Sequence, residues 1–218
     1  MNFAELRTAF YDYTDDEAKD LHKTDKAARL INAGLRMLGR KLEVVDEWYF
    51  VECILYDVTK NDKDLLFTLP ANFKRVKTAE RLLSSGDPIP VRWVQFPRRH
   101  GEITFPPHRL RSTTRPAVYM FGSRIGVVTP DENYTLRLWY SQSIPLLNDE
   151  GDVPLGIPED HHDTIALQAA KLAYQIESRQ FPFQEEFTQG MQDLMTTTQQ
   201  RQRQEPRYVQ EGNAGYGD

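Results

Sequence analysis

The stretch WYFVECILYDV, from Trp48 to Val58, marks the point at which the sequence changes its pattern. It is rich in aromatic and β-branched residues, which favour strands over helices. Before it, apolar residues recur every three or four positions, which is the spacing of a helix. After it come short apolar runs separated by Gly, Pro, Asn and Asp, the residues of turns. The chain is therefore predicted to change from helical to β-rich near residue 48.

Two helices are predicted before this stretch. The first is short, and its apolar face consists of Phe3, Leu6, Phe10 and Tyr13. The second runs from about Asp25 to Glu43, and its apolar stripe consists of Ala28, Ile31, Leu35, Leu38 and Leu42. Two glycines in it, Gly34 and Gly39, each weaken the helix by about 1 kcal/mol relative to alanine. We expect them to allow another helix to approach closely.

Further strands are predicted after it in LLFTLP, IPVRWVQF, AVYMFG, RIGVVTP and NYTLRLWYSQ. In the last of these, Leu136 and Leu138 share one face with Tyr134 and Tyr140, because successive side chains alternate across a strand. Short strands with close turn signals indicate an antiparallel sheet or a small sandwich rather than a βαβ fold.

Two more helices are predicted after the loop IPLLNDEGDVPLGIP. The inner face of the first comprises His162, Ile165, Ala166, Ala169, Leu172, Ala173 and Ile176. The second runs from about Gln184 to Gln200, with Phe187, Met191, Leu194 and Met195 directed inward. From Thr196 the chain contains almost no apolar residues, so it cannot bury enough surface to offset its ordering entropy. We expect an extended tail there.

The net charge of −5 is spread unevenly along the 218 residues. From Lys74 to Arg124 there are eleven Lys and Arg against three acidic residues, a charge of +8, which leaves −13 for the rest. The single cysteine, Cys53, excludes an intramolecular disulfide and a cysteine-cluster zinc site. The sequence has neither a signal peptide nor an apolar run of about 18 residues, so we expect synthesis in the cytoplasm and no membrane span.

The segment IPEDHHD, which begins at Ile157, is the strongest candidate for an active site. Pro158 suits the first position of a helix, and the following carboxylates complement the helix dipole. Adjacent histidines point about 100° apart, whereas metal ligands on a helix are three or four residues apart. We therefore interpret the segment as a helix start, with His162 at the edge of the core. A metal-dependent hydrolase is the alternative, with Glu159, His161 and His162, joined by His100 or His108.

The basic middle of the chain is the second candidate. Its cations are Lys74, Arg75, Lys77, Arg98, Arg99, Arg109 and Arg111. Lysine and arginine bind phosphates in a salt-sensitive, sequence-independent way. A patch of this kind suits double-stranded DNA, an acidic partner or the chain's own acidic segments. A monomeric, non-specific DNA-binding protein is the corresponding alternative function.

The order of these elements resembles the head-to-tail adaptor (connector) proteins of tailed bacteriophages. The resemblance rests on AARLINAGLRMLGRK, LLFTLPANFKRV, YTLRLWY and IPEDHHDTIALQAAKLAYQ, in that order, and it covers most of the chain. The stretch from Arg81 to Arg115 has no counterpart, and its role is not predicted.

The resemblance implies a structural virion protein without catalysis or cofactor, located at the head-tail junction. Such adaptors form twelve-membered rings of identical copies beneath the portal vertex of the capsid. The ring binds the portal protein and tail components such as nozzle or fibre proteins, and double-stranded DNA passes through its channel. The C-terminal tail contacts the portal. Arginine offers bidentate pairing and tyrosine rigid contact area, so the predicted contacts are Arg201, Arg203, Arg207, Tyr208 and Val209.

The sequence thus predicts an α+β fold. Both chain ends, residues 1–45 and 157–200, form a four-helix element. An antiparallel β-rich domain, residues 46–156, is inserted between the second and third helices. Residues 201–218 form the extended tail.

Overall fold

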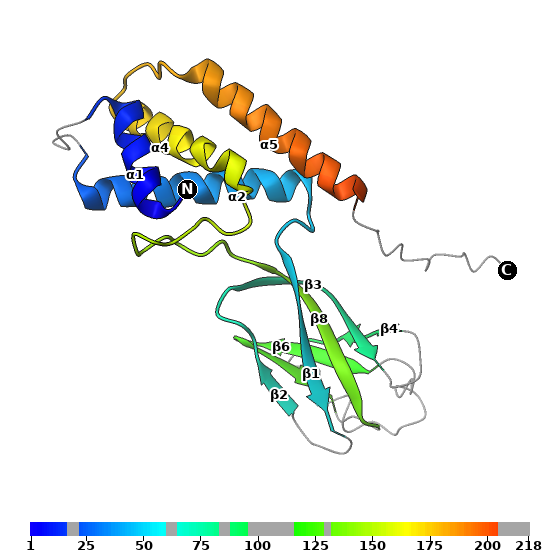
Figure 1. The fold of residues 1–218 in the computed structure, drawn as a ribbon. Coiled ribbons are helices and arrows are strands. Elements are labelled where there is room, and N and C mark those ends of the chain that lie inside the picture. The colour runs from blue at the N-terminus through cyan, green and yellow to red at the C-terminus, as the bar shows by residue number, and fades with distance from the viewer. Residues whose placement is uncertain (17–21, 60–64, 83–87, 96–115, 129–131, 205–218) are drawn as a thin grey trace. The chain divides into compact units, whose positions relative to one another are not determined.

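The structure is a computed structural model, and it describes residues 1–16, 22–59, 65–82, 88–95, 116–128 and 132–204. The chain divides into two compact units (Figure 1). The helical unit comprises Met1–Tyr49 and Ile144–Asp218, and the β unit comprises Phe50–Ser143. No helix in the described ranges combines the length and apolar character needed to cross a membrane.

The described part of the helical unit has four α-helices, as the sequence predicts. These are α1 (Phe3–Thr14), α2 (Thr24–Val45), α4 (His162–Ile176) and α5 (Gln184–Gln204). Helix α1 begins with a capping box, in which the Asn2 side chain accepts from the Glu5 N–H at 2.9 Å and the Glu5 carboxylate accepts from the Asn2 N–H at 2.8 Å. Helix α4 contacts α1, α2 and α5 and is the centre of the unit (Figure 1).

Helices α2 and α4 approach closely because small residues line their contact. A Cβ atom at Gly34 would lie 3.1 Å from the backbone nitrogen of Ala169 and 3.2 Å from the backbone oxygen of Ile165. The close packing predicted for Gly34 is confirmed. The small residues of α4 are fully buried inside this unit, and they are Ala166, Ala169, Ala170 and Ala173. Within α4, Ile176 was predicted to face inward, but it is 63% exposed because the helix ends there.

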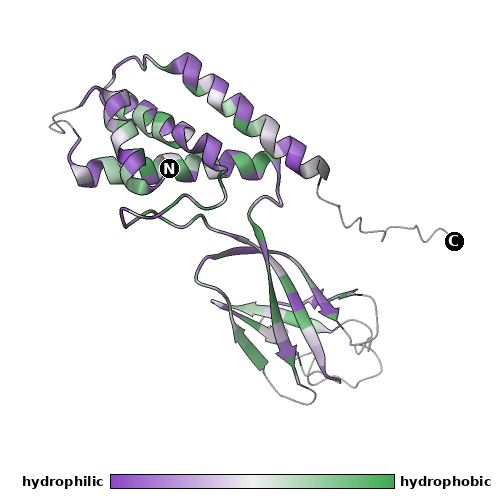
Figure 2. Cartoon of the chain, in the orientation of Figure 1, coloured by the Kyte–Doolittle hydropathy of each residue, from purple (hydrophilic) through white to green (hydrophobic). Residues whose placement is uncertain are grey.

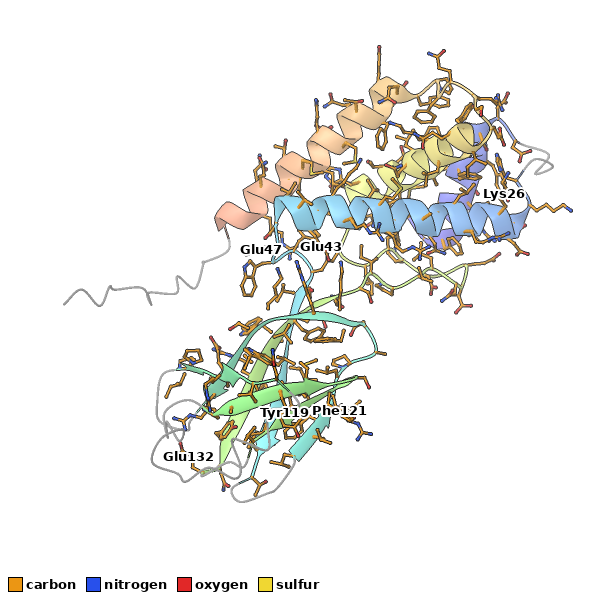
Figure 3. All side chains as sticks on the ribbon, turned by 180° about the vertical axis from the view of Figure 1, so that it is seen from behind. Lys26, Glu43, Glu47, Tyr119, Phe121 and Glu132 are labelled. Carbon is orange, nitrogen blue, oxygen red and sulfur yellow. The ribbon has the colours of Figure 1, made fainter. Side chains whose placement is uncertain are left out.

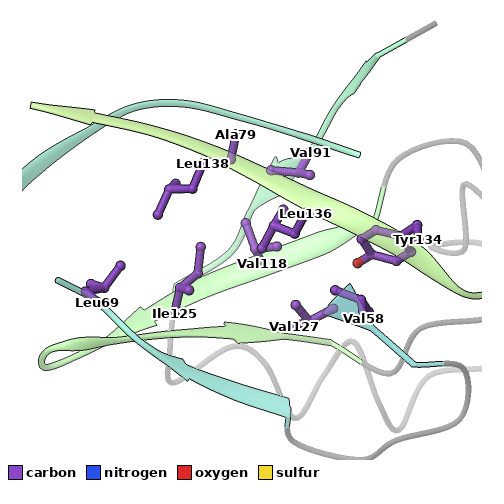
Figure 4. Packing of buried hydrophobic residues seen from close by; sticks show 10 residues of the cluster. All are labelled: Val58, Leu69, Ala79, Val91, Val118, Ile125, Val127, Tyr134, Leu136 and Leu138. Atoms are coloured by element: carbon purple, nitrogen blue, oxygen red, sulfur yellow. The ribbon is translucent and has the colours of Figure 1, made fainter. Parts of the chain in front are cut away.

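The β unit is a sandwich of two four-stranded sheets, ordered β1-β8-β3-β4 and β2-β7-β6-β5. Antiparallel pairing, which the sequence predicts, joins all these neighbours except β5 and β6, which are parallel. The buried side chains of the two sheets meet in one core, shown in Figure 4. The strands are β1 (Val51–Val58), β2 (Leu65–Thr68), β3 (Phe73–Leu82), β4 (Ile89–Pro90), β5 (Arg92–Trp93), β6 (Ala117–Phe121), β7 (Arg124–Val127) and β8 (Tyr134–Gln142).

Strand β8 carries the clearest alternation. Tyr134, Leu136, Leu138 and Tyr140 are buried, as predicted, while the residues between them are half-buried. Its neighbour β3 is the longest strand in the described part of the unit, and none of the strands predicted above covers it. Only the family motif LLFTLPANFKRV reaches its first residues, Phe73–Val76. The strand reads FKRVKTAERL, and its many charged residues are poor strand formers. It forms a strand because it pairs with β8 along almost its whole length.

The start of α4 differs from the prediction. Pro158 precedes a 3₁₀ turn, η2 (Glu159–His161), and the α-helix begins only at His162. At the other end of the unit, α5 continues to Gln204, four residues beyond the predicted end and into the predicted tail. Residues 144–156 group with the helices, because the buried Asn32 of α2 binds the backbone of Leu147.

Candidate assembly surfaces

The two adjacent histidines at the start of α4 diverge. His162 is buried, and its Nε2 lies 2.9 Å from the carbonyl oxygen of Ile157, so this nitrogen carries the hydrogen. Its Nδ1 lies 3.0 Å from the Met1 nitrogen. His161 turns the other way, toward the Thr197 hydroxyl on α5 at 3.2 Å. Both rings therefore tie segments together within the unit.

This arrangement is unlike a metal centre. Glu159 lies 3.4 Å from the Met1 nitrogen, and His162 uses both of its ring nitrogens in contacts with the chain. Across the described ranges there is no group of three or more His, Cys, Asp or Glu that could hold a metal ion. His100 and His108, the other predicted ligands, lie outside the described residues. The described side chains fit the helix-start interpretation, with His162 packed in the core.

A groove on the helical unit was not predicted from the sequence. It lies between α2 and α5, where two adjoining hollows share Lys41 and Met195. We call it the α2–α5 groove, defined by Lys41, Val44, Phe187, Met191 and Met195. Met191 and Met195 were predicted to face inward, but they are only half-buried and line this groove. Val44 is 87% exposed, although it is a β-branched apolar residue.

The α2–α5 groove is basic as well as apolar. The Lys41 and Lys171 ammonium groups lie 5.3 and 4.5 Å from the centre of the buried Phe187 ring. Such contacts stabilise a cation against the negative face of the ring. Burial, together with the charge of Lys171, lowers the pKa of Lys41. Arg40 adds a third cation, and the described residues that line the groove include no carboxylate.

A second surface is the acidic loop, residues Ile144–Ile157. It contains Asp149, Glu150 and Asp152 and has no Lys or Arg. Its buried anchors are Leu147, Pro154 and Ile157. Beside these anchors it exposes Leu146, Val153 and Leu155, which are 46%, 51% and 61% accessible. It therefore presents apolar side chains beside negative charge.

The backbone of the acidic loop is held firmly. Asn32 donates to the Leu147 carbonyl and accepts from its N–H, both at 2.9 Å. The carbonyls of Glu150 and Asp152 accept from the first N–H groups of α1, at 3.1 and 2.7 Å. These contacts satisfy donors that a helix start otherwise leaves unpaired. The Asp152 carboxylate accepts two N–H groups within the loop, and these hydrogen bonds lower its pKa.

Comparison with known proteins matches nearly the whole chain to one family. The model of the SU10 adaptor protein family matches residues 1–210. The chain belongs to this family. No curated protein matches the sequence. The family consists of phage head-to-tail adaptors, which confirms the resemblance found in the sequence. The adaptor is thus a structural protein of the phage virion at the head-tail junction, where it interacts with other head and tail proteins.

Three of the predicted basic residues of the adaptor lie together on β3. Lys74 and Arg75 are exposed, and Lys77 is half-buried. The register of β3 against β8 shifts between Phe73 and Arg75 and again after Val76, so both lysines lie at bulges. A bulge redirects the side chain of the extra residue. The other predicted members, Arg98, Arg99, Arg109 and Arg111, lie outside the described residues.

Two other cations of the β unit, Arg81 and Arg137, are paired within the adaptor. Arg81 is buried and forms an ion pair with Glu132, which Figure 3 labels. Arg137 donates to Glu80 at 2.8 Å, and its guanidinium lies over the Trp139 ring. These pairs join neighbouring strands or close the end of the sheet. They leave less positive charge for a partner than the sequence count suggests.

Of the predicted portal contacts, the structure places only Arg201. Its guanidinium lies 5.6 Å from the centre of the Tyr49 ring, so it already has a partner in the helical unit. Burial raises the pKa of Tyr49, and the charge of Arg201 opposes this effect. The Arg203 side chain and residues Arg207, Tyr208 and Val209 lie outside the described part of the chain.

Proposed function

We propose that the adaptor assembles into a closed, twelve-membered ring that joins the portal vertex of the capsid to the tail and lines a passage for DNA. The observation that carries this proposal is the match of residues 1–210 to a family of phage head-to-tail adaptors.

The distribution of charge supports a passage for DNA. The β unit contains fourteen Lys and Arg against nine Asp and Glu, a net charge of +5, which leaves −10 for the helical unit. A basic unit tolerates the nearby phosphates, whereas an acidic one repels them. We assign the DNA-facing role to the predicted patch, in which Lys74 and Arg75 are exposed on β3.

We assign separate tasks to the parts of the chain. The helical unit, Met1–Tyr49 and Ile144–Asp218, makes the contacts between copies through the part that precedes its tail. The β unit, Phe50–Ser143, receives tail proteins such as the nozzle or fibre. The tail, 201–218, contacts the portal through Arg201, Arg203, Arg207, Tyr208 and Val209. A tail with few apolar residues suits this task, since a partner supplies the surface that orders it.

Electron microscopy of the adaptor mixed with its portal protein tests the proposal. We expect rings with twelvefold symmetry stacked on the portal. Particles with another symmetry would contradict the ring number, and an adaptor that stayed monomeric beside intact portal rings would contradict the function.

A charge reversal tests the passage separately. The variant Lys74→Glu/Arg75→Glu should form the same rings, because both side chains are exposed. It should also bind duplex DNA more weakly, with a smaller dependence on salt. Rings of the variant that bound DNA as tightly as the native rings, at every salt concentration, would remove these residues from the passage.

A further inference from the structure

The ring proposed above needs two different surfaces on each copy, because neighbours in a closed ring meet head to tail. The helical unit offers two such surfaces, the acidic loop and the α2–α5 groove. From their shape, charge and placement we infer that the acidic loop of one adaptor copy docks in the α2–α5 groove of the next. This inference rests on the proposed ring and names its contact.

The first argument is chemical complementarity. The groove presents Arg40 and Lys41 around methionine and valine side chains, and Lys171 lies over the ring of Phe187, which also lines the groove. The loop presents three carboxylates around Leu146, Val153 and Leu155. Asp149 is exposed at the tip of the loop, whereas Glu150 pairs with Arg7 at 2.7 Å. Opposite charges around an apolar centre fix the register of an interface and exclude other partners.

The second argument is placement. The loop packs on α2 at Asn32, and Lys41, which lines both hollows of the groove, is nine residues later. Nine residues at about 100° each leave the two side chains about 180° apart around the helix axis. Figures 1 and 3 agree with this, since the loop and α5 lie on opposite sides of α2. One copy can therefore hold a neighbour on each side at once.

The third argument is preorganisation on one side and adaptability on the other. The loop is fixed by Asn32 and by the start of α1, so little conformational entropy is lost when it binds. The groove is lined by Met191 and Met195, whose flexible side chains adjust to the shape of a bound partner. Figure 2 shows that hydrophilic residues cover much of α5, so this groove is a local apolar site on a polar helix.

Disulfide trapping tests the contact directly. Cysteines replace Val44 in the groove and Leu155 in the loop, in a Cys53→Ser background. Under oxidation, the Val44→Cys/Leu155→Cys variant should give a ladder of covalent dimers and higher oligomers. The control is Val44→Cys/Ile176→Cys, because Ile176 is exposed to the same extent as Leu155, 63% against 61%, and belongs to neither surface. No ladder, or an equal ladder in the control, would overturn the inference.

Charge substitutions test the direction of the contact. Val44→Asp and Leu155→Asp should each raise the dissociation constant between copies about ten- to hundredfold, the loss expected for one buried apolar side chain. Ile176→Asp should leave it unchanged. An equimolar mixture of the Val44→Asp and Leu155→Asp variants retains one intact contact per pair, so it should form dimers and no rings. Full association of either variant alone would contradict the inference.

The experiments distinguish a failure of the proposed ring from a failure of the loop–groove contact. If electron microscopy shows rings while the cysteine pair gives no ladder, the ring stands and the loop–groove contact is wrong. If neither rings nor a ladder form, the proposed function and this inference are both wrong.

Discussion

Replacing Asn32 by leucine tests whether one buried amide holds the acidic loop in place. Leucine has a similar shape but can neither donate nor accept a hydrogen bond. The substitution leaves the N–H and the carbonyl of Leu147 without their 2.9 Å partners. Each orphaned buried group costs about 1–3 kcal/mol. We expect the free energy of unfolding to fall by about 2–6 kcal/mol, with the lower end if the loop opens and water replaces the amide.

Two measurements separate these outcomes. Urea unfolding measures the decrease in the free energy of unfolding of the whole protein, and amide hydrogen exchange at Leu147 reports local opening of the loop. Arg36→Leu is the matched control, because Arg36 is exposed one turn along the same helix. Its effect should stay within about 0.5 kcal/mol. If Asn32→Leu cost as little as the control and exchange at Leu147 stayed slow, the amide would not position the loop.

Three further predictions concern pH, the β core and the tail. Burial lowers the pKa of His22 in the folded protein. As the pH falls, His22 therefore takes up a proton in the unfolded chain before it does so in the folded one. The free energy of unfolding should decrease as the pH falls through about 6.5. Urea midpoints should show this decrease, and His22→Gln should reduce it; an equal decrease in the variant would exclude His22. Leu138→Ala should lower the free energy of unfolding, measured with urea, by about 2–5 kcal/mol, because Leu138 is fully buried in the β core. Leu55→Ala should have little effect on the urea unfolding curve, because Leu55 is exposed. A chain ending at Gln200 should keep its urea midpoint but lose co-sedimentation with portal rings, and retained binding would show that the tail assignment is wrong.

The elements with strong periodicity were predictable from the sequence. The stripe of α2 and the alternation of β8 both reflect burial on one face, which a sequence records directly. Strand β3 was mostly missed because its local sequence is charged, and only pairing with β8 makes it a strand. Local propensity cannot reveal a partner that lies some sixty residues away in the chain.

Of the candidate sites, the histidine pair could be interpreted from the sequence, and the groove could not. The spacing of His161 and His162 was enough to argue against a shared metal ligand set, because adjacent residues on a helix diverge. The α2–α5 groove was invisible in the sequence, since it joins residues near 41 with residues near 191. One signal for the groove was available in the sequence: Val44 is apolar but lies outside the apolar stripe of its helix, so it does not point into the core. Apolar residues off the stripe are therefore worth noting in related sequences.

The ends of the β unit lie side by side, since the N–H of Gln142 donates to the carbonyl of Phe50 at 2.9 Å. The chain thus leaves the helical unit and returns to it at two adjacent points. Such an insertion behaves as a cassette. Replacing Phe50–Ser143 by a tight turn should leave the helices able to fold, and grafting a foreign sandwich with adjacent ends should be tolerated. Under the proposed division of tasks, exchange of this unit would let a phage lineage accept a new tail component while the helical frame stays unchanged.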